Sequence, residues 1–148
     1  SRGLGDVYKR QVKKGIELLN NKKGFFLMTE SGKIDWACHA NDAAASIHDV
    51  LEMSNAVQAA VDFYNAHPNE TLILVTADHE TGGLTVVSND RDFTAAESGI
   101  EYKYSTTSHS GTPVILYAYG AGAYNFSGVI ENTEVFRLIK ALLIDQQK

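Results

Sequence analysis

Six side chains that commonly bind divalent metal ions occur in three separate segments of this sequence. They are Glu30, Asp35, His39, Asp78, His79 and His109. Carboxylate oxygens and imidazole nitrogens are donors that zinc accepts, and carboxylates also suit magnesium. Because the segments are far apart along the chain, only a fold that brings them together could use all six donors. The sequence therefore predicts a metal centre assembled by tertiary structure.

The spacing of five donors indicates how they could share ions. Asp35 and His39 are four residues apart, so a helical or tight-turn path would place both side chains on one side. A third ligand must come from elsewhere, and we expect His109 to supply it. Asp78 and His79 are neighbours at a predicted strand end, where both could turn toward a second ion.

The remaining donor, Glu30, is a hard carboxylate that is better suited to magnesium, which takes only one or two protein carboxylates. Two zinc ions about 4 Å apart would clamp the attacking and leaving oxygens of a phosphoryl transfer. A pair of zinc ions held in this way would therefore suit phosphoryl transfer.

Short apolar runs typical of buried strands precede the donors. Phe25–Met28 would deliver Glu30 at its carboxyl end, and Thr71–Thr76 would deliver the Asp78-His79 pair. Further strands are predicted at Leu84–Val87, Ile100–Tyr104 and Val114–Tyr119. In open α/β sheets ligands bind beyond the carboxyl ends of the strands, so the placement of the donors agrees with their chemistry.

Helical periodicity predicts the elements that flank these strands. One helix begins near Val12, and another begins after a cap at Asn132 or Thr133. Between Asp42 and about Ala66, a single face is predicted to be core: Ile47, Val50, Leu51, Ser54, Val57, Ala60, Val61 and Tyr64. Strands alternating with amphipathic helices indicate an α/β sheet covered on both faces.

Composition limits the alternatives. With 148 residues, of which 44% are hydrophobic, the chain can bury one core, so one domain is expected. The net charge of −5 and the lack of a Lys/Arg cluster argue against a nucleic-acid-binding surface. The apolar runs are too short to span a bilayer, and the lone Cys38 permits no internal disulfide.

The first residues differ in character from the rest. Asp6–Gln11 resembles the translation of a sequencing-library adapter. We therefore expect residues 1–11 to be a processing scar rather than native sequence, with a frayed natural tail as the alternative. On the first interpretation, residues 12–148 are the downstream part of a longer protein.

Three segments together resemble a known enzyme family. Thr29–His39 is similar to the alkaline phosphatase signature Glu-Gly-x-x-Ile-Asp-x-x-x-His. Val75–Glu80 resembles its Thr-Ala-Asp-His strand end, and Ser108–Val114 resembles its late His-Thr-Gly segment. The matches come in family order and extend from about Gly24 to the C-terminus. Each match alone is weak, but the combination is specific.

The resemblance implies a fold and a set of roles. The fold would be a partial three-layer α/β/α sandwich of the alkaline phosphatase type, with the N-terminal half missing. The first zinc would be bound by Asp35, His39 and His109, and the second zinc by Asp78 and His79. Glu30 would contribute to a magnesium site. The reaction would be hydrolysis of small phosphate monoesters through a phosphoserine intermediate.

The resemblance also has gaps. The nucleophilic serine of the family lies in an Asp-Ser-Ala-type segment, and no such segment occurs here. We therefore expect no catalytic nucleophile in this chain and no activity from it alone. The family further implies export to the periplasm or cell surface, and a homodimer of the full-length protein.

Other interpretations remain open. A metal phosphodiesterase, nucleotide pyrophosphatase or phosphomutase of the same superfamily would share most of the donor pattern, and a non-catalytic metal-binding fragment is a third possibility. Trp36 could be either core or the wall of a substrate pocket. His48 and His67 are expected to be exposed and not to bind metal.

Overall fold

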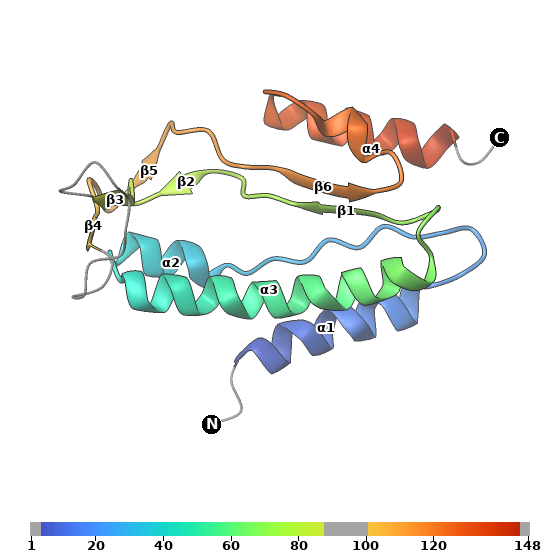
Figure 1. Cartoon of the computed structure of the whole chain (residues 1–148), viewed down its shortest axis with the longest axis horizontal. Helices are drawn as coiled ribbons and strands as arrows, with labels where there is room; N and C mark the ends of the chain where they lie inside the picture. The colour runs from blue at the N-terminus through green and yellow to red at the C-terminus, as the bar shows by residue number, and fades with distance from the viewer. Residues whose placement is uncertain (1–3, 88–100, 146–148) are drawn as a thin grey trace.

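The computed structural model describes residues 4–87 and 101–145, which form an α/β arrangement of helices and short strands (Figure 1). The helices are α1 (Leu4–Leu19), α2 (Lys33–His39), α3 (Ala43–Ala66), the 3₁₀ helix η1 (Ala123–Phe126) and α4 (Asn132–Asp145). The strands are β1 (Leu72–Val75), β2 (Glu80–Thr81), β3 (Thr85–Val87), β4 (Glu101–Lys103), β5 (His109–Ser110) and β6 (Tyr117–Gly120). The polar connection at 88–98 and Ile100 lie outside the described residues.

The described strands pair as three separate antiparallel ladders, β1 with β6, β2 with β5 and β3 with β4. The α/β sheet that the alternation of strands and helices indicated is therefore divided, in the described residues, into three short ladders. The predicted strand at Phe25–Met28 is wrong, because this segment has no assigned strand structure. An apolar run indicates burial, but a strand also needs a neighbour to accept its backbone hydrogen bonds.

The main core lies between α1 and α3. Val12, Ala56 and Ala59 are buried together, and Tyr8, Ile16 and Met53 pack against them. Small alanines on α3 allow α1 to approach closely. Helix α1 begins at Leu4 rather than near Val12 as predicted, because residues before Val12 continue the same helical face. Whether residues 1–11 are a native sequence stays a prediction, since helical geometry does not depend on origin.

Helix α3 shows why the predicted core face was wrong. Its ends are as expected: the Asp42 side chain accepts a hydrogen bond from the backbone N–H of Ala45, and the helix stops before Pro68. Its buried residues, however, are Ala43, Ser46, Asp49, Ala56 and Ala59. The larger apolar residues Ile47, Val50 and Leu51 are 56%, 49% and 60% exposed. The helix is apolar on two sides, and the small-residue side is the one that meets α1.

Helix α3 contacts β1, and α4 contacts η1, which follows β6. The β1–β6 pair lies between the two helices in Figure 1. The rings of Tyr64 on α3 and Tyr119 on β6 lie 4.7 Å apart. Gly122 has a φ of 76°, and a Cβ there would lie 2.9 Å from Leu142 on α4. This close approach explains the glycine-containing turn after β6. None of the described helices is long and apolar enough to cross a membrane.

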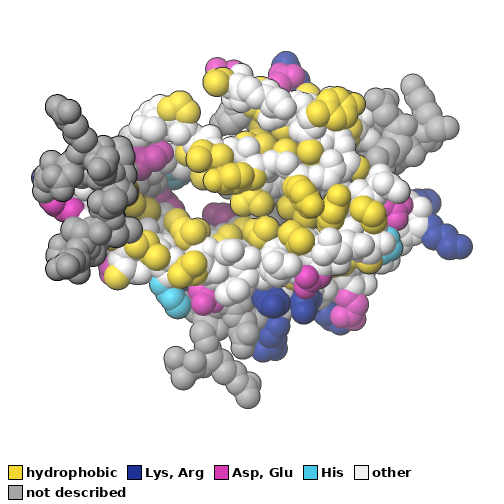
Figure 2. Space-filling model, in the orientation of Figure 1, with side chains coloured by type: hydrophobic (Ala, Val, Ile, Leu, Met, Phe, Trp, Pro, Cys, Tyr) yellow, Lys and Arg dark blue, Asp and Glu magenta, His cyan; other side chains and the backbone are white. Residues whose placement is uncertain are grey.

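Hydrophobic side chains gather over the middle of the face shown in Figure 2, which is hollowed near its centre. The exposed apolar residues include Phe26, Met28, Ile115, Tyr117 and Tyr119 as well as those of α3. An apolar surface of this kind is typical of a surface that another part of a protein covers.

Candidate metal centre

Helix α2 positions the first two donors. Asp35 lies in its first turn and His39 in its last, and His39 Nε2 lies 3.5 Å from Asp35 Oδ2. Of the two paths predicted, a helix or a tight turn, the structure has the helix. His39 Nδ1 lies 2.7 Å from the backbone carbonyl oxygen of Thr107. Because a carbonyl only accepts, Nδ1 carries the proton and Nε2 keeps its lone pair for an ion.

The chain beyond β1 positions Asp78 and His79. His79 Nε2 lies 3.5 Å from Asp78 Oδ2, with the side chain of His79 31% exposed and that of Asp78 88% exposed. His79 is followed at once by β2, a two-residue strand that sequence reasoning did not identify. Because β2 begins there, the backbone of His79 is held while the Asp78 side chain remains in solvent.

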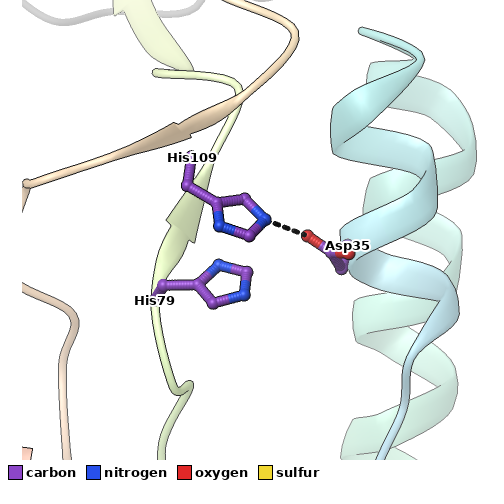
Figure 3. A group of neighbouring side chains, drawn as sticks. All are labelled: Asp35, His79 and His109. Atoms are coloured by element: carbon purple, nitrogen blue, oxygen red, sulfur yellow. Dashed lines mark ion pairs between the residues drawn. The ribbon is translucent and has the colours of Figure 1, made fainter.

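The β2–β5 ladder brings His109 to the other donors. Thr81 pairs with His109 in antiparallel register, so a residue far along the chain is placed beside His79. The two imidazole rings stack with centroids 3.6 Å apart, and the ring of His39 lies 5.1 Å from that of His109. Figure 3 shows His109 pointing at Asp35, with Nε2 4.0 Å from Oδ1.

The donor atoms of Asp35, His79 and His109 all lie within 4.8 Å of one another. Ligands around a zinc ion at about 2.0–2.2 Å from each donor would be about 3.4 Å apart, so small side-chain movements would suffice. One carboxylate and two imidazoles also leave a coordination position open, as in catalytic zinc sites. The donor set therefore fits a divalent transition metal.

The structure does not bring all six predicted donors together. His39 adjoins the group through Asp35, and Asp78 adjoins it through His79. Glu30 is exposed and lies outside the group, at the end of the extended segment that has no strand partner. The division of the donors between two zinc ions and the assignment of Glu30 to magnesium stay predictions.

Three other residues have the following environments. Trp36, next to Asp35, is 70% exposed, so it is not core. His48 is exposed as predicted. His67 is half-buried rather than exposed, and its Nδ1 lies 3.1 Å from Glu70 Oε1.

Two threonines beside the donors were missed by the sequence analysis. Thr107 accepts from His39 through its carbonyl, and the buried Thr81 contacts both Asp35 and His79 through its hydroxyl. For Thr107 no sequence signal exists, because any residue has a carbonyl. For Thr81 a weak signal exists, since residues two apart on a strand point to one face.

Gly82 fixes the loop that carries His109. Its N–H donates to the Ser108 carbonyl at 2.9 Å, and its own carbonyl accepts from Ser105 and Thr106. Gly82 has a φ of 91°, and a Cβ there would lie 2.8 Å from Tyr104 and 3.1 Å from the Cys38 carbonyl oxygen. Burial raises the pKa of the Tyr104 hydroxyl.

We expect Gly82→Ala to lower the free energy of unfolding by about 2–4 kcal/mol, because strained backbone and overpacking act together. Urea unfolding followed by circular dichroism measures it. Gly24→Ala has the same strained φ but nothing within 4 Å, so it isolates the backbone cost. Gly111→Ala has neither feature and should change stability by less than about 0.5 kcal/mol. Equal effects at Gly82 and Gly111 would contradict this account.

Comparison with known proteins identifies the family of the chain. The sequence profile described as alkaline phosphatase matches residues 7–99, more than half of the chain. The chain belongs to the alkaline phosphatase family. It is 35% identical over 145 residues to the alkaline phosphatase of Escherichia coli (strain K12), covering 88% of this chain and 30% of that protein. It is 33% identical over 134 residues to the streptomycin-6-phosphate phosphatase of Streptomyces griseus, covering 82% and 30%.

Solved alkaline phosphatase structures share the fold. The enzyme from the Antarctic bacterium TAB5 superposes with a TM-score of 0.84 at 33% identity, covering 96% of this chain and 42% of that one. A His 135 Asp variant of that enzyme, with Mg bound in its M3 site, superposes with a TM-score of 0.83 at 33% identity and covers the same shares of the two chains. The α/β fold expected from the resemblance is thus confirmed. The chain spans less than half the length of these relatives.

Proposed function

We propose that this chain supplies most of the metal ligands of an alkaline phosphatase that hydrolyses small phosphate monoesters through a phosphoserine intermediate. The observation that carries the proposal is the convergence of Asp35, His79 and His109 from three separate segments. Membership of the alkaline phosphatase family supports it, and so does the phosphate ester named for one relative.

The proposed ligand sets follow the family pattern. Asp35, His39 and His109 would hold the first zinc, and Asp78 and His79 would contribute to the second. Glu30 would contribute to a magnesium ion, and the Mg named in the TAB5 variant supports such a site in the family. Bound zinc would supply a Lewis acid and an activated water.

The chain's own residues would orient these groups. Helix α2 holds Asp35 and His39 one turn apart, and the Thr107 carbonyl fixes the ring of His39. The β2–β5 register fixes His109 beside His79. Such fixed donors lose little freedom when an ion binds, which favours tight and selective binding.

The nucleophile would lie outside this chain, so the 148 residues alone would bind metal without turnover. The hydroxyl next to His109 supports this, because Ser110 Oγ donates to the Glu80 carboxylate, and Glu80 also accepts from the Gly83 N–H. Ser110 is therefore held as a structural donor. We further propose that residues 12–148 are the native part, and that the full-length protein is an exported homodimer of the periplasm or cell surface.

We expect no turnover of p-nitrophenyl phosphate by purified 1–148 supplied with zinc and magnesium. The assay follows p-nitrophenolate absorbance against a buffer control. The longer open reading frame from the same DNA should hydrolyse the ester under identical conditions, and a chelator should abolish that activity. Zinc-dependent turnover by 1–148 that is lost in Asp78→Ala would contradict the proposal, and so would a longer frame that encodes no Asp-Ser-Ala-type segment.

A further inference from the structure

The Thr81 hydroxyl lies between two donors of the metal centre. Its Oγ1 donates to Asp35 Oδ1 at 2.6 Å and lies 3.1 Å from His79 Nδ1. The residue is 7% exposed, so water does not compete strongly for these contacts. Thr81 also pairs with His109 in the β2–β5 ladder, which places its backbone at the third donor of the group.

Counting hydrogens assigns a direction to each bond. A threonine hydroxyl has a single proton, and a carboxylate can only accept. Because Thr81 gives that proton to Asp35, its oxygen can only accept from His79. His79 must therefore carry its proton on Nδ1. In the neutral ring this leaves the lone pair on Nε2, which lies 3.5 Å from Asp78 Oδ2, as the nitrogen that can bind an ion.

The same arrangement occurs at His39, where the Thr107 carbonyl lies 2.7 Å from Nδ1. The two histidines are thus prepared in the same tautomer by different means, one by a main-chain oxygen and one by a side chain. Only the Thr81 contact can be removed by substitution, which makes it the one to test.

We propose that Thr81 is a positioning residue that fixes His79 in its Nδ1–H tautomer and aims Asp35 Oδ1, and so prepares both for the metal ion. The proposal rests on the proposed function, because it concerns the same ions. Partners of this kind typically change metal affinity by about 10–100-fold when removed. Their effect comes from orientation and ligand basicity rather than from contact with the metal.

The test compares Thr81→Val, which keeps the shape and removes the hydroxyl, with Thr81→Ser, which keeps the hydroxyl. Zinc affinity is measured by competition with a chromophoric chelator, with circular dichroism as a check of folding. We expect about 10–100-fold weaker zinc binding in Thr81→Val and recovery to within about threefold of the parent in Thr81→Ser. A purely structural role would not predict recovery by the smaller residue.

A second measurement needs no variant. Long-range ¹H–¹⁵N spectra of the metal-free chain, labelled at histidine, report which ring nitrogen carries the proton. His79 should show the Nδ1–H pattern, with its signal assigned by its loss in His79→Gln. Thr81→Val should shift His79 toward a mixture of tautomers and leave His39 unchanged.

The outcomes separate this inference from the proposed function. If the parent chain binds no zinc, the proposed function fails. If the parent binds zinc, but His79 is an Nε2–H tautomer or Thr81→Val binds zinc as tightly as the parent, the role of Thr81 is overturned and the metal centre stands. If Thr81→Val does not fold, the tautomer of the parent and the affinity of Thr81→Ser decide.

Discussion

Replacing Asp35 by alanine should weaken zinc binding by the chain by about 100-fold or more. Asp35 is within 4.0 Å of both His39 and His109 and accepts from Thr81, so its loss removes a ligand and an orienting contact at once. Removal of an orienting partner alone costs about 10–100-fold, and removal of a ligand should cost more. Competition with a chromophoric chelator measures the affinity.

The matched control is Asp62→Ala. Asp62 is an exposed acid near the C-terminal end of α3, and its side chain accepts a hydrogen bond from Gln58 at 3.0 Å. It is not one of the six predicted donors. Its removal changes the net charge equally and should leave zinc affinity within about twofold. Asp35→Asn keeps the shape and one oxygen donor and should fall between the two. Similar affinities in Asp35→Ala and Asp62→Ala would show that zinc binds elsewhere.

Replacing Ala56 by aspartate should lower the free energy of unfolding by about 3 kcal/mol or more. Ala56 is 1% exposed and packs with Val12 and Ala59 between α1 and α3. A carboxylate there would be buried without a partner and too large for the space. Chemical unfolding followed by circular dichroism gives the change.

Ala44→Asp serves as the control because it makes the same substitution in the same helix. Ala44 is exposed in the first turn of α3, where a negative charge interacts favourably with the helix dipole. We expect no loss of stability and a gain of a few tenths of a kcal/mol at most. A loss at Ala56 no larger than that at Ala44 would mean that the α1–α3 contact is not the core in solution.

Sequence patterns predicted which segments form helices and strands better than they predicted which strands pair. The helices at Asp35–His39 and after Asp42 and the β1 strand follow from spacing, capping and β-favouring residues, which are local. The ladders, in contrast, depend on which strands lie nearby, and the run at Phe25–Met28 has no neighbour among the described strands. Local sequence does not contain that information.

The candidate metal centre likewise combines features that local sequence indicated with features that it did not. The helical spacing of Asp35 and His39 and the adjacency of Asp78 and His79 could be read directly. The stacking of His79 on His109 could not, because it depends on the register of a two-residue ladder that no pattern indicated. Thr81 was missed because its contribution depends on the direction of one hydrogen bond.

Helix α3 has an exposed apolar face, which is unusual for a helix in a folded protein. A helix that is apolar around most of its circumference is normally surrounded by protein. Here α1 covers one side, and Ile47, Val50 and Leu51 remain exposed. The chain spans less than half the length of its relatives, and an open apolar face of this kind is typical of a surface that protein covers.

The position of Trp36 has a practical consequence. It is the only tryptophan of the sequence, adjoins Asp35 and is 70% exposed. Emission excited selectively at tryptophan therefore comes from a single indole, on the residue next to a donor of the candidate metal centre. Quenching by Co²⁺ or a spectral shift on adding inorganic phosphate would report occupancy directly, without a dye or a label. The molecule thus carries its own optical probe.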